Sequence, residues 1–190
     1  MSPLEIAGTV LGLANIILLV RRSVWNFPVA MAMVTCIGIV LAEAKLYAEA
    51  GLQVFFFVVN AWGWWLWLRA RGPADEVPVG WLTWPARIAW ALATAIASVA
   101  LGLTLARWTD AALPMADSAV TGMSVAAQFL LSFRRIENWV LWIVIDVVSI
   151  GLYVIRDLHL LAGLYVVFLA LSVMGLREWT LAQRRGAARA

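Results

Sequence analysis

Hydrophobic positions run along this chain in long stretches, separated by short breaks rich in charge, proline or glycine. A helix needs about 20 mostly apolar residues to cross a hydrocarbon core roughly 30 Å thick. Seven stretches meet this requirement, and we predict helices at 4–20, 25–42, 50–68, 84–106, 114–133, 138–155 and 158–176. The longest polar break, 69–80, is too short for a second domain and is predicted to be a loop. The pattern predicts a single transmembrane domain over residues 1–190, all-α, with seven transmembrane helices.

Composition supports the same class. Hydrophobic residues make up 64% of the chain and charged residues 13%, whereas soluble domains carry about 25% charged residues. The first apolar stretch begins almost at Met1 with no basic segment before it, so we expect a retained helix and not a cleaved signal peptide. The single cysteine, Cys36, cannot form an internal disulfide.

Basic residues are distributed unevenly between the two sets of loops. Of the 14 Lys and Arg residues, Lys45, Arg107 and Arg156 follow the second, fourth and sixth predicted helices, and the others follow the first, third, fifth and seventh. Because cytoplasmic loops carry the excess of basic residues, the N-terminus is predicted outside and the C-terminus in the cytoplasm. A pI near 9.6 also suits nucleic-acid binding, but no soluble domain is available for it.

An offset of 112 residues aligns the two ends of the chain. It superimposes like residues in seven pairs: Arg22/Arg134, Asn26/Asn138, Leu46/Leu158, Gly51/Gly163, Leu52/Leu164, Gly63/Gly175 and Trp67/Trp179. We predict a 3+1+3 arrangement with repeat one at 1–68, a linker helix at 84–106 and repeat two at 114–180. Four helices separate equivalent positions, so the repeat is parallel, about an axis along the bilayer normal. Chance alignment of Leu- and Ala-rich helices is the alternative.

Polar and aromatic residues recur at steps of three and four, which places them on one face of each helix. The sixth helix has such a stripe at Trp139, Trp142, Asp146, Ser149 and Tyr153, with Asn138 beside its start. The third has Gln53, Phe57, Asn60, Trp64 and Trp67; the fifth has Asp117, Thr121, Ser124 and Gln128; the first adds Asn15. These faces predict a polar cavity between the two triplets.

Asp146 is the most informative of these residues. A carboxylate at the middle of a membrane helix costs about 2.5–3.5 kcal/mol on insertion scales, and no Lys or Arg lies at matching depth to pair with it. We therefore expect a functional role. An aromatic site with one buried anion favours a flat, polar cation.

Structural roles remain open for the other stripe residues. Ser and Thr often bond to their own helix, and Asn15, Asn60 and Gln128 could join helices to one another. Interfacial anchoring is the alternative for the tryptophans near the helix ends, and the preferred interpretation for the last of them: Trp64, Trp67, Trp139 and Trp179.

Three segments carry a family resemblance: "LQVFFFVVNAWGWWLW" (52–67), "RRIENWVLWIVIDVVSIGLYV" (134–154) and "LYVVFLALSVMGLREW" (164–179). They closely resemble the PnuC family of bacterial nicotinamide riboside carriers, and the likeness covers nearly the whole chain. The resemblance implies a SWEET-like 3+1+3 fold in the inner membrane. It also implies facilitated diffusion without ATP, made one-way by a cytoplasmic kinase that phosphorylates the substrate, and a homotrimer.

The family pattern of an Asn-Trp pair, a further Trp and an amide falls on Asn138, Trp139, Trp142 and position 146. Asn60, Gly63, Trp64 and Trp67 match its third-helix signature. The departure is Asp146, where the family usually has Asn; an ionised carboxylate accepts hydrogen bonds but cannot donate them. The substrate therefore stays open between nicotinamide riboside and another cationic vitamin such as thiamine.

The predicted function is uptake of nicotinamide riboside, with no cofactor, no metal and no enzymatic step. The residues predicted to bind the substrate are Asp146, Trp142, Trp139, Asn138, Gln128, Asn60, Trp64, Gln53 and Ser149. A membrane-embedded enzyme using Asp146, Ser149 and His159 is the remote alternative. His159 lies about two turns beyond Asp146, too far for a triad, and the chain lacks HExxH and GxSxG motifs.

Overall fold

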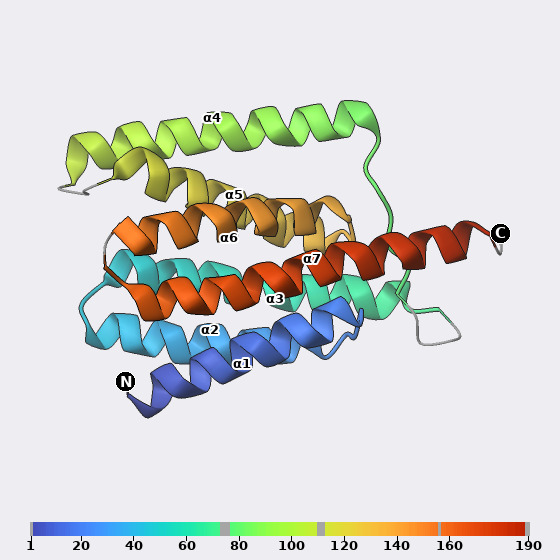
Figure 1. Ribbon diagram of the computed structural model, residues 1–190, viewed down its shortest axis with the longest axis horizontal. Helices are drawn as coiled ribbons and strands as arrows, with labels where there is room; N and C mark the ends of the chain where they lie inside the picture. Colours follow the sequence, from blue (N-terminus) through green and yellow to red (C-terminus); the bar gives the residue numbers. More distant parts are fainter. Residues whose placement is uncertain (1, 73–76, 110–112, 156, 189–190) are drawn as a thin grey trace.

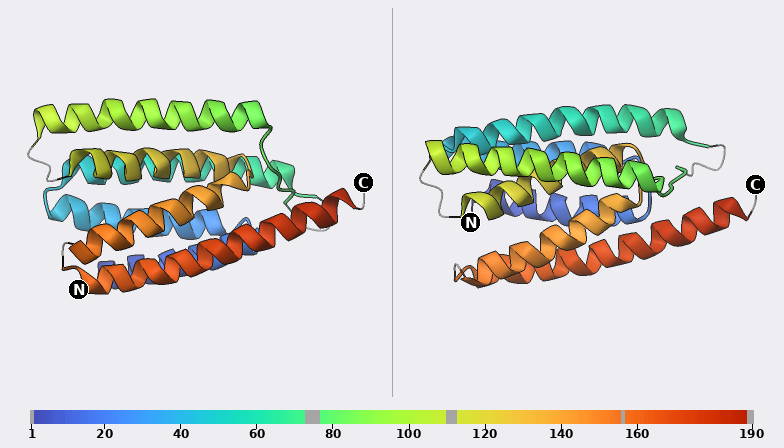
Figure 2. Two further views of the ribbon diagram at one scale, coloured as in Figure 1. Left: turned by 45° about the horizontal axis from the view of Figure 1, so that its top comes forward. Right: turned by 90° about the horizontal axis from the view of Figure 1, so that it is seen from above.

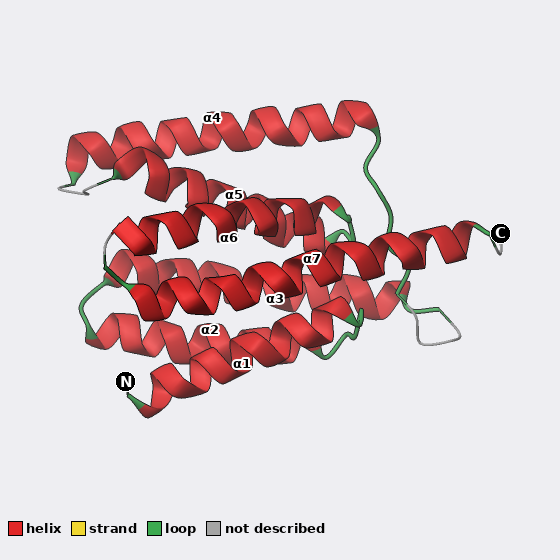
Figure 3. Cartoon of the chain, in the orientation of Figure 1, coloured by secondary structure: helices red, strands yellow, loops and turns green. Residues whose placement is uncertain are grey.

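The computed structural model describes residues 2–72, 77–109, 113–155 and 157–188. Within these ranges it contains seven helices that run along a common direction (Figures 1 and 3). They are α1 (Pro3–Val20), α2 (Asn26–Glu43), α3 (Tyr47–Ala70), α4 (Trp84–Trp108), α5 (Pro114–Ser132), α6 (Glu137–Ile155) and α7 (His159–Ala187). The prediction of seven helices is confirmed. Two basic residues used for the orientation, Arg156 and Arg189, lie outside the described residues.

The largest difference from the predicted helix ends is in α7, which continues to Ala187, well past the predicted end at 176. In the added segment, "REWTLAQRRGA", seven of the 11 residues are Arg, Ala, Leu or Gln, which are good helix formers. Hydrophobicity predicts where the membrane segment ends, but the helix continues past that point because the following residues favour helix. This end of α7 projects beyond the bundle (Figure 1).

Six of the helices described are long and apolar enough to cross a membrane, and α5 is not among them. Polar residues such as Ser118, Thr121 and Gln128 lower its hydropathy. However, α5 packs against α3, α4 and α6 and is the most enclosed helix of the bundle (Figure 2). Its polar side chains are therefore shielded by protein, and a hydropathy threshold suited to lipid-facing helices does not apply to it.

Helix neighbours follow a simple order. Consecutive helices pack within α1–α3 and within α5–α7, and the two groups meet through α1 with α7 and α3 with α5. Among the described residues, α4 packs on α5 alone, at the outside of the bundle (Figures 1 and 2). Helix α4 therefore contacts the second group through α5 and has no packing contact with α1–α3 among the described residues.

Hydrogen bonds at the helix ends recur at positions 112 residues apart. The indole Nε1 of Trp67 donates to the carbonyl of Leu131 at 3.1 Å. The indole Nε1 of Trp179 donates to the carbonyl of Leu19, also at 3.1 Å. In the first pair the donor is on α3 and the acceptor on α5, and in the second the donor is on α7 and the acceptor on α1. Each group of three helices therefore donates one indole hydrogen bond to the other group. The side-chain amides of Asn26 and Asn138, and the left-handed residue pairs Arg22/Arg134 and Lys45/Asp157, repeat in the same way.

Two glycines allow close helix contacts at equivalent positions. A Cβ placed on Gly63 would lie 2.6 Å from the Phe27 ring, and one placed on Gly175 would lie 2.5 Å from the Trp139 ring. Gly63 has no room for a side chain unless both the Phe27 ring and the Ser132 hydroxyl move, and Gly175 has none unless the Trp139 ring moves. Both glycines and both rings are again separated by 112 residues.

The tryptophans near the helix ends do not form an interfacial belt. Trp67 and Trp179 have no exposed surface and Trp139 has 1%; Trp64 is partly buried and packs against the same core. The interfacial interpretation is wrong for the three buried residues. Carbonyls in the last turns of α1 and α5 accept two of the indole N–H groups, so these tryptophans can be buried at the helix ends.

The break between α3 and α4 is more structured than a plain loop. Val77 is fully buried in the core, and its carbonyl accepts a bond from Arg22 Nη1 at 3.3 Å. Gly80 forms two backbone bonds with the α5–α6 turn, to Arg134 O (3.2 Å) and from Ile136 N (3.1 Å). Residues 77–83 therefore connect the residues that follow α1 to the α5–α6 turn at this end of the bundle.

Candidate functional site

A cavity of about 220 Å³ lies inside the bundle, between α1, α2, α5, α6 and α7. We name it the central cavity. Four of the residues predicted to bind substrate line it: Asp146, Trp142, Trp139 and Gln128. Asn15 and Ser124, which belong to the polar faces noted in the sequence, line it as well. The stripe on α6 therefore faces the central cavity at Trp139, Trp142 and Asp146.

Asp146 is the tenth of 19 residues in α6 and only 3% exposed. Its Oδ2 accepts a hydrogen bond from the Ser172 hydroxyl on α7, at 2.9 Å. No Lys or Arg is among the described residues that line the central cavity. The carboxylate is thus held by a neutral donor beside a space that contains no protein cation.

Gln128 is held by a residue that does not itself line the cavity. Its Nε2 donates to Asn60 Oδ1 at 3.0 Å, and Asn60 Nδ2 donates to the carbonyl of Phe56 at 2.8 Å. The two amides form a chain from α3 to α5. Asn60 therefore fixes the orientation of Gln128 and acts one step away from the cavity.

Two polar atoms on residues that line the cavity are buried without a hydrogen-bond partner among the described residues. They are the indole Nε1 of Trp139, a donor, and Oδ1 of Asn15, an acceptor. Buried polar groups are nearly always satisfied, by protein, water or ligand. A water or a ligand that both donates and accepts hydrogen bonds would satisfy the two atoms.

Sequence reasoning missed the contribution of α7 to this cavity. Tyr165, Phe168 and Ser172 line it, together with Met33 of α2. A signal for Ser172 was present, because the 112-residue offset places it opposite Asn60. The aromatic residues of α7 follow no polar stripe, so the sequence pattern did not distinguish them from core residues.

Other predicted site residues lie elsewhere. Asn138 is fully buried, and its Nδ2 donates to the carbonyl of Arg135 at 2.6 Å, which closes the turn before α6. Trp64 packs against the aromatic core, and Gln53 lines a separate cavity between α2 and α3. None of these three lines the central cavity.

Ser149 lines a second, smaller cavity of about 190 Å³. Asp117 and Thr121 of α5 and Tyr153 of α6 also line it. Val120 lines both this cavity and the central one, so the two spaces are adjacent. The polar faces predicted for α5 and α6 are therefore divided between two neighbouring cavities.

The residues of the enzymatic alternative are not assembled. His159 has 73% of its side chain exposed, and its Nε2 lies 3.9 Å from Asp157, while Asp146 bonds to Ser172. The described residues contain no group of three His, Cys, Asp or Glu side chains able to hold a metal ion.

Residues 2–181 match the family described as nicotinamide mononucleotide transporter. The chain belongs to this family. A solved structure of the family, described as the crystal structure of the vitamin B3 transporter PnuC, superimposes with a TM-score of 0.79 at 25% identity, covering 96% of this chain and 82% of the other. The fold of this transporter is therefore the fold found here.

Two curated relatives in the same family differ in the vitamin that their names give. The nicotinamide riboside transporter PnuC of Escherichia coli is 28% identical, over all of this chain and 90% of its own length. The riboflavin/roseoflavin transporter RibM of Streptomyces davaonensis is 29% identical, over 95% of this chain and 86% of its own. Both are transporters and not enzymes, and this chain is accordingly a multi-pass membrane transporter.

Proposed function

We propose that this protein is a facilitative carrier of the bacterial inner membrane that takes up nicotinamide riboside. The substrate binds at mid-membrane in the central cavity, between α1–α3 and α5–α7. One observation carries the proposal: Asp146 is a buried carboxylate beside an aromatic cavity whose described lining residues include no basic side chain. A site of this kind attracts an organic cation.

Nicotinamide riboside fits the other groups of the cavity as well. Its pyridinium ring carries a permanent positive charge that can stack on Trp142, while Asp146 supplies the opposite charge. Its ribose hydroxyls both donate and accept, as the unpaired Asn15 Oδ1 and Trp139 Nε1 require. A nucleotide would bring a phosphate toward Asp146, so the chemistry favours the nucleoside.

We propose different roles for the predicted site residues. Asp146, Trp142, Trp139 and Gln128 contact the substrate, while Asn60 and Ser172 position Gln128 and Asp146 through the bonds described above. Asn138 and Trp64 act through the scaffold, because one closes a turn and the other packs in the aromatic core. Ser149 lines the cavity next to the central one and is proposed to act before or after the central site, while Gln53 lines a separate cavity and is given no role in binding.

The architecture proposed is the 3+1+3 parallel repeat, with α4 as linker, α5 as the seventh span and the N-terminus outside. The bonds that recur 112 residues apart support the repeat. The two chain ends lie at opposite ends of the bundle, as an odd number of spans requires (Figure 1). Assembly as a homotrimer and trapping by a cytoplasmic kinase rest on the family resemblance.

Two other vitamins are compatible with parts of this picture. Thiamine is also a flat cation, and the RibM relative makes riboflavin a candidate. Riboflavin is neutral and larger, and the cavity of about 220 Å³ is already smaller than the roughly 300–1,000 Å³ of most ligand sites. The Asp146 carboxylate attracts a cation, and riboflavin carries no positive charge that could gain from this attraction.

The test is uptake into liposomes that contain the purified protein and no imposed ion gradient. Labelled nicotinamide riboside should enter saturably, and excess unlabelled nicotinamide riboside should compete more strongly than thiamine or riboflavin. Saturable thiamine or riboflavin uptake without nicotinamide riboside uptake would contradict the substrate proposed. An absolute requirement for a pH gradient would contradict facilitated diffusion.

A further inference from the structure

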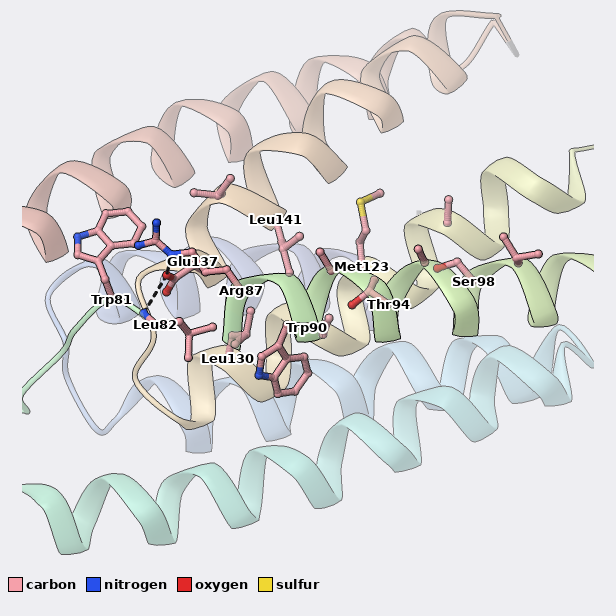
Figure 4. A pocket seen from close by; sticks show the side chains of 16 residues that line it. Trp81, Leu82, Arg87, Trp90, Thr94, Ser98, Met123, Leu130, Glu137 and Leu141 are labelled. Carbon is pink, nitrogen blue, oxygen red and sulfur yellow. Dashed lines mark hydrogen bonds and ion pairs between the residues drawn. The ribbon is translucent and has the colours of Figure 1, made fainter. Parts of the chain in front are cut away.

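A groove that is larger than the central cavity lies on the outside of the bundle, away from that cavity. It is a groove of about 630 Å³ lined by side chains of α4, α5 and α6 (Figure 4). Among the described helices α4 packs on α5 alone, so a gap remains between α4 and α6, with α5 as its floor. Ala91, Ala95 and Val99 of α4 line the groove and are exposed. The groove therefore opens onto the surface that faces lipid.

One end of this groove is polar. Arg87 Nε on α4 bonds to Glu137 Oε1 at the start of α6, at 2.7 Å (Figure 4). The Arg87 guanidinium also lies 5.0 Å from the Trp81 ring centroid and 5.6 Å from that of Trp84. Arginine and tryptophan at a helix end are typical of the level of lipid headgroups.

Glu137 is incompletely satisfied at this end. Its Oε1 accepts bonds from Arg87 and from the backbone N–H of Leu82, at 2.9 Å for the latter. Its Oε2 is buried and has no hydrogen-bond partner among the described residues. A buried carboxylate oxygen without a donor is costly, and this one belongs to a residue that lines the groove. The group that fits here is a cationic hydrogen-bond donor.

The remaining length of the groove is almost entirely apolar, apart from Thr94 and Ser98 (Figure 4). From Arg87 to Val99 the helix advances roughly 18 Å, at about 1.5 Å per residue. One leaflet of a bilayer contributes about half of a hydrocarbon core roughly 30 Å thick. The groove is therefore about as long as one acyl chain.

We propose that this groove is a binding site for phosphatidylethanolamine. The primary ammonium of the headgroup donates to Glu137 Oε2, the phosphate accepts from the part of the Arg87 guanidinium that Glu137 leaves free, and one acyl chain lies along α4. A zwitterionic headgroup matches the acid–base pair at this end. An anionic headgroup such as that of phosphatidylglycerol would meet an arginine already paired with a carboxylate, and it would offer Oε2 only neutral hydroxyl donors in place of an ammonium.

Native mass spectrometry of the detergent-purified protein tests this site, with equimolar phosphatidylethanolamine and phosphatidylglycerol of identical acyl chains as probes. The wild type should retain phosphatidylethanolamine in preference to phosphatidylglycerol. Glu137→Gln should lower that preference by about tenfold, the effect of one charge-assisted hydrogen bond. Equal retention of both lipids, or an unchanged preference in Glu137→Gln, would contradict the proposal.

A matched pair of variants tests the acyl chain independently of the headgroup. Ala95→Trp fills the groove and should abolish lipid retention. Ala97→Trp is the control, since Ala97 is exposed on the same helix and does not line the groove. Equal loss in both variants would indicate a nonspecific lipid shell and overturn the proposal. A lipid-free wild-type oligomer that Ala95→Trp splits into single chains would identify the occupant as a second copy. Neither result depends on the transported substrate.

Discussion

Helices α1–α3 and α5–α7 share their internal bonds but differ at the positions that face mid-membrane. Where α6 has Trp142 and Asp146, the equivalent residues of α2 are Ala30 and Val34, all at an offset of 112. Val34 and Asp146 are buried to the same extent, 3% exposed each. The frame is thus nearly symmetric and the binding chemistry is not. We propose that the shared frame fixes the helix positions, while a few residues in one half determine what is bound.

The largest effect is expected from Asp146→Val, which places the residue of α2 in α6. Loss of the buried charge partner of a cation typically costs about 2–5 kcal/mol, so nicotinamide riboside uptake should fall by at least about 30-fold. Initial uptake rates in liposomes measure this. Val34→Leu is the control, and it should transport normally. An Asp146→Val protein with wild-type uptake would show that the asymmetry is not functional.

The two close glycine contacts allow a direct comparison of the halves. Gly63→Ala and Gly175→Ala each force a methyl group against a ring and should destabilise the protein by about 1–3 kcal/mol. Thermal unfolding in detergent measures both. Only Gly175→Ala should also weaken substrate binding, because Trp139 lines the central cavity and Phe27 does not. Equal effects on binding would contradict the asymmetry of the site.

The reciprocal indole bonds test the symmetry of the frame. Trp67→Phe and Trp179→Phe each remove one N–H donor and leave a small cavity at a fully buried site, and each should lower the free energy of unfolding by at least about 1 kcal/mol. Chemical unfolding should give equal losses for the two variants within experimental error. A much larger loss for one of them would show that one group of helices carries more of the stability.

The smallest effect is expected from Ser172→Ala, which removes the hydroxyl that holds Asp146. The apparent affinity for substrate should fall by roughly threefold to tenfold, within the range of a single hydrogen bond, with little change in the maximal rate. Concentration-dependent uptake separates the two quantities. Thr180→Ala is the control on the same helix, since the one side-chain bond of its hydroxyl among the described residues is to the Leu176 carbonyl. Equal changes in both variants would rule out a positioning role for Ser172.

Periodicity and hydropathy predicted the seven helices and the inward face of α6, because these follow from burial against lipid or protein. They could not separate a ligand contact from a structural bond of the same residue type. Asn138 and Gln128 are both buried amides, but only the tertiary arrangement shows that one closes a turn and the other lines a cavity. The hydroxyl of Ser172 was missed for the same reason, since its partner lies on another helix.

The bond from Trp179 to Leu19 joins residues 160 positions apart. Because α1 is synthesised before α7, the Leu19 carbonyl can accept the Trp179 indole N–H only after the ribosome has made α7, although it accepts the backbone N–H of Arg22 within its own turn. The contact between α1 and α7 can form only after α7 has inserted. Until then the flank of α1 that packs on α7 has no helix to cover it.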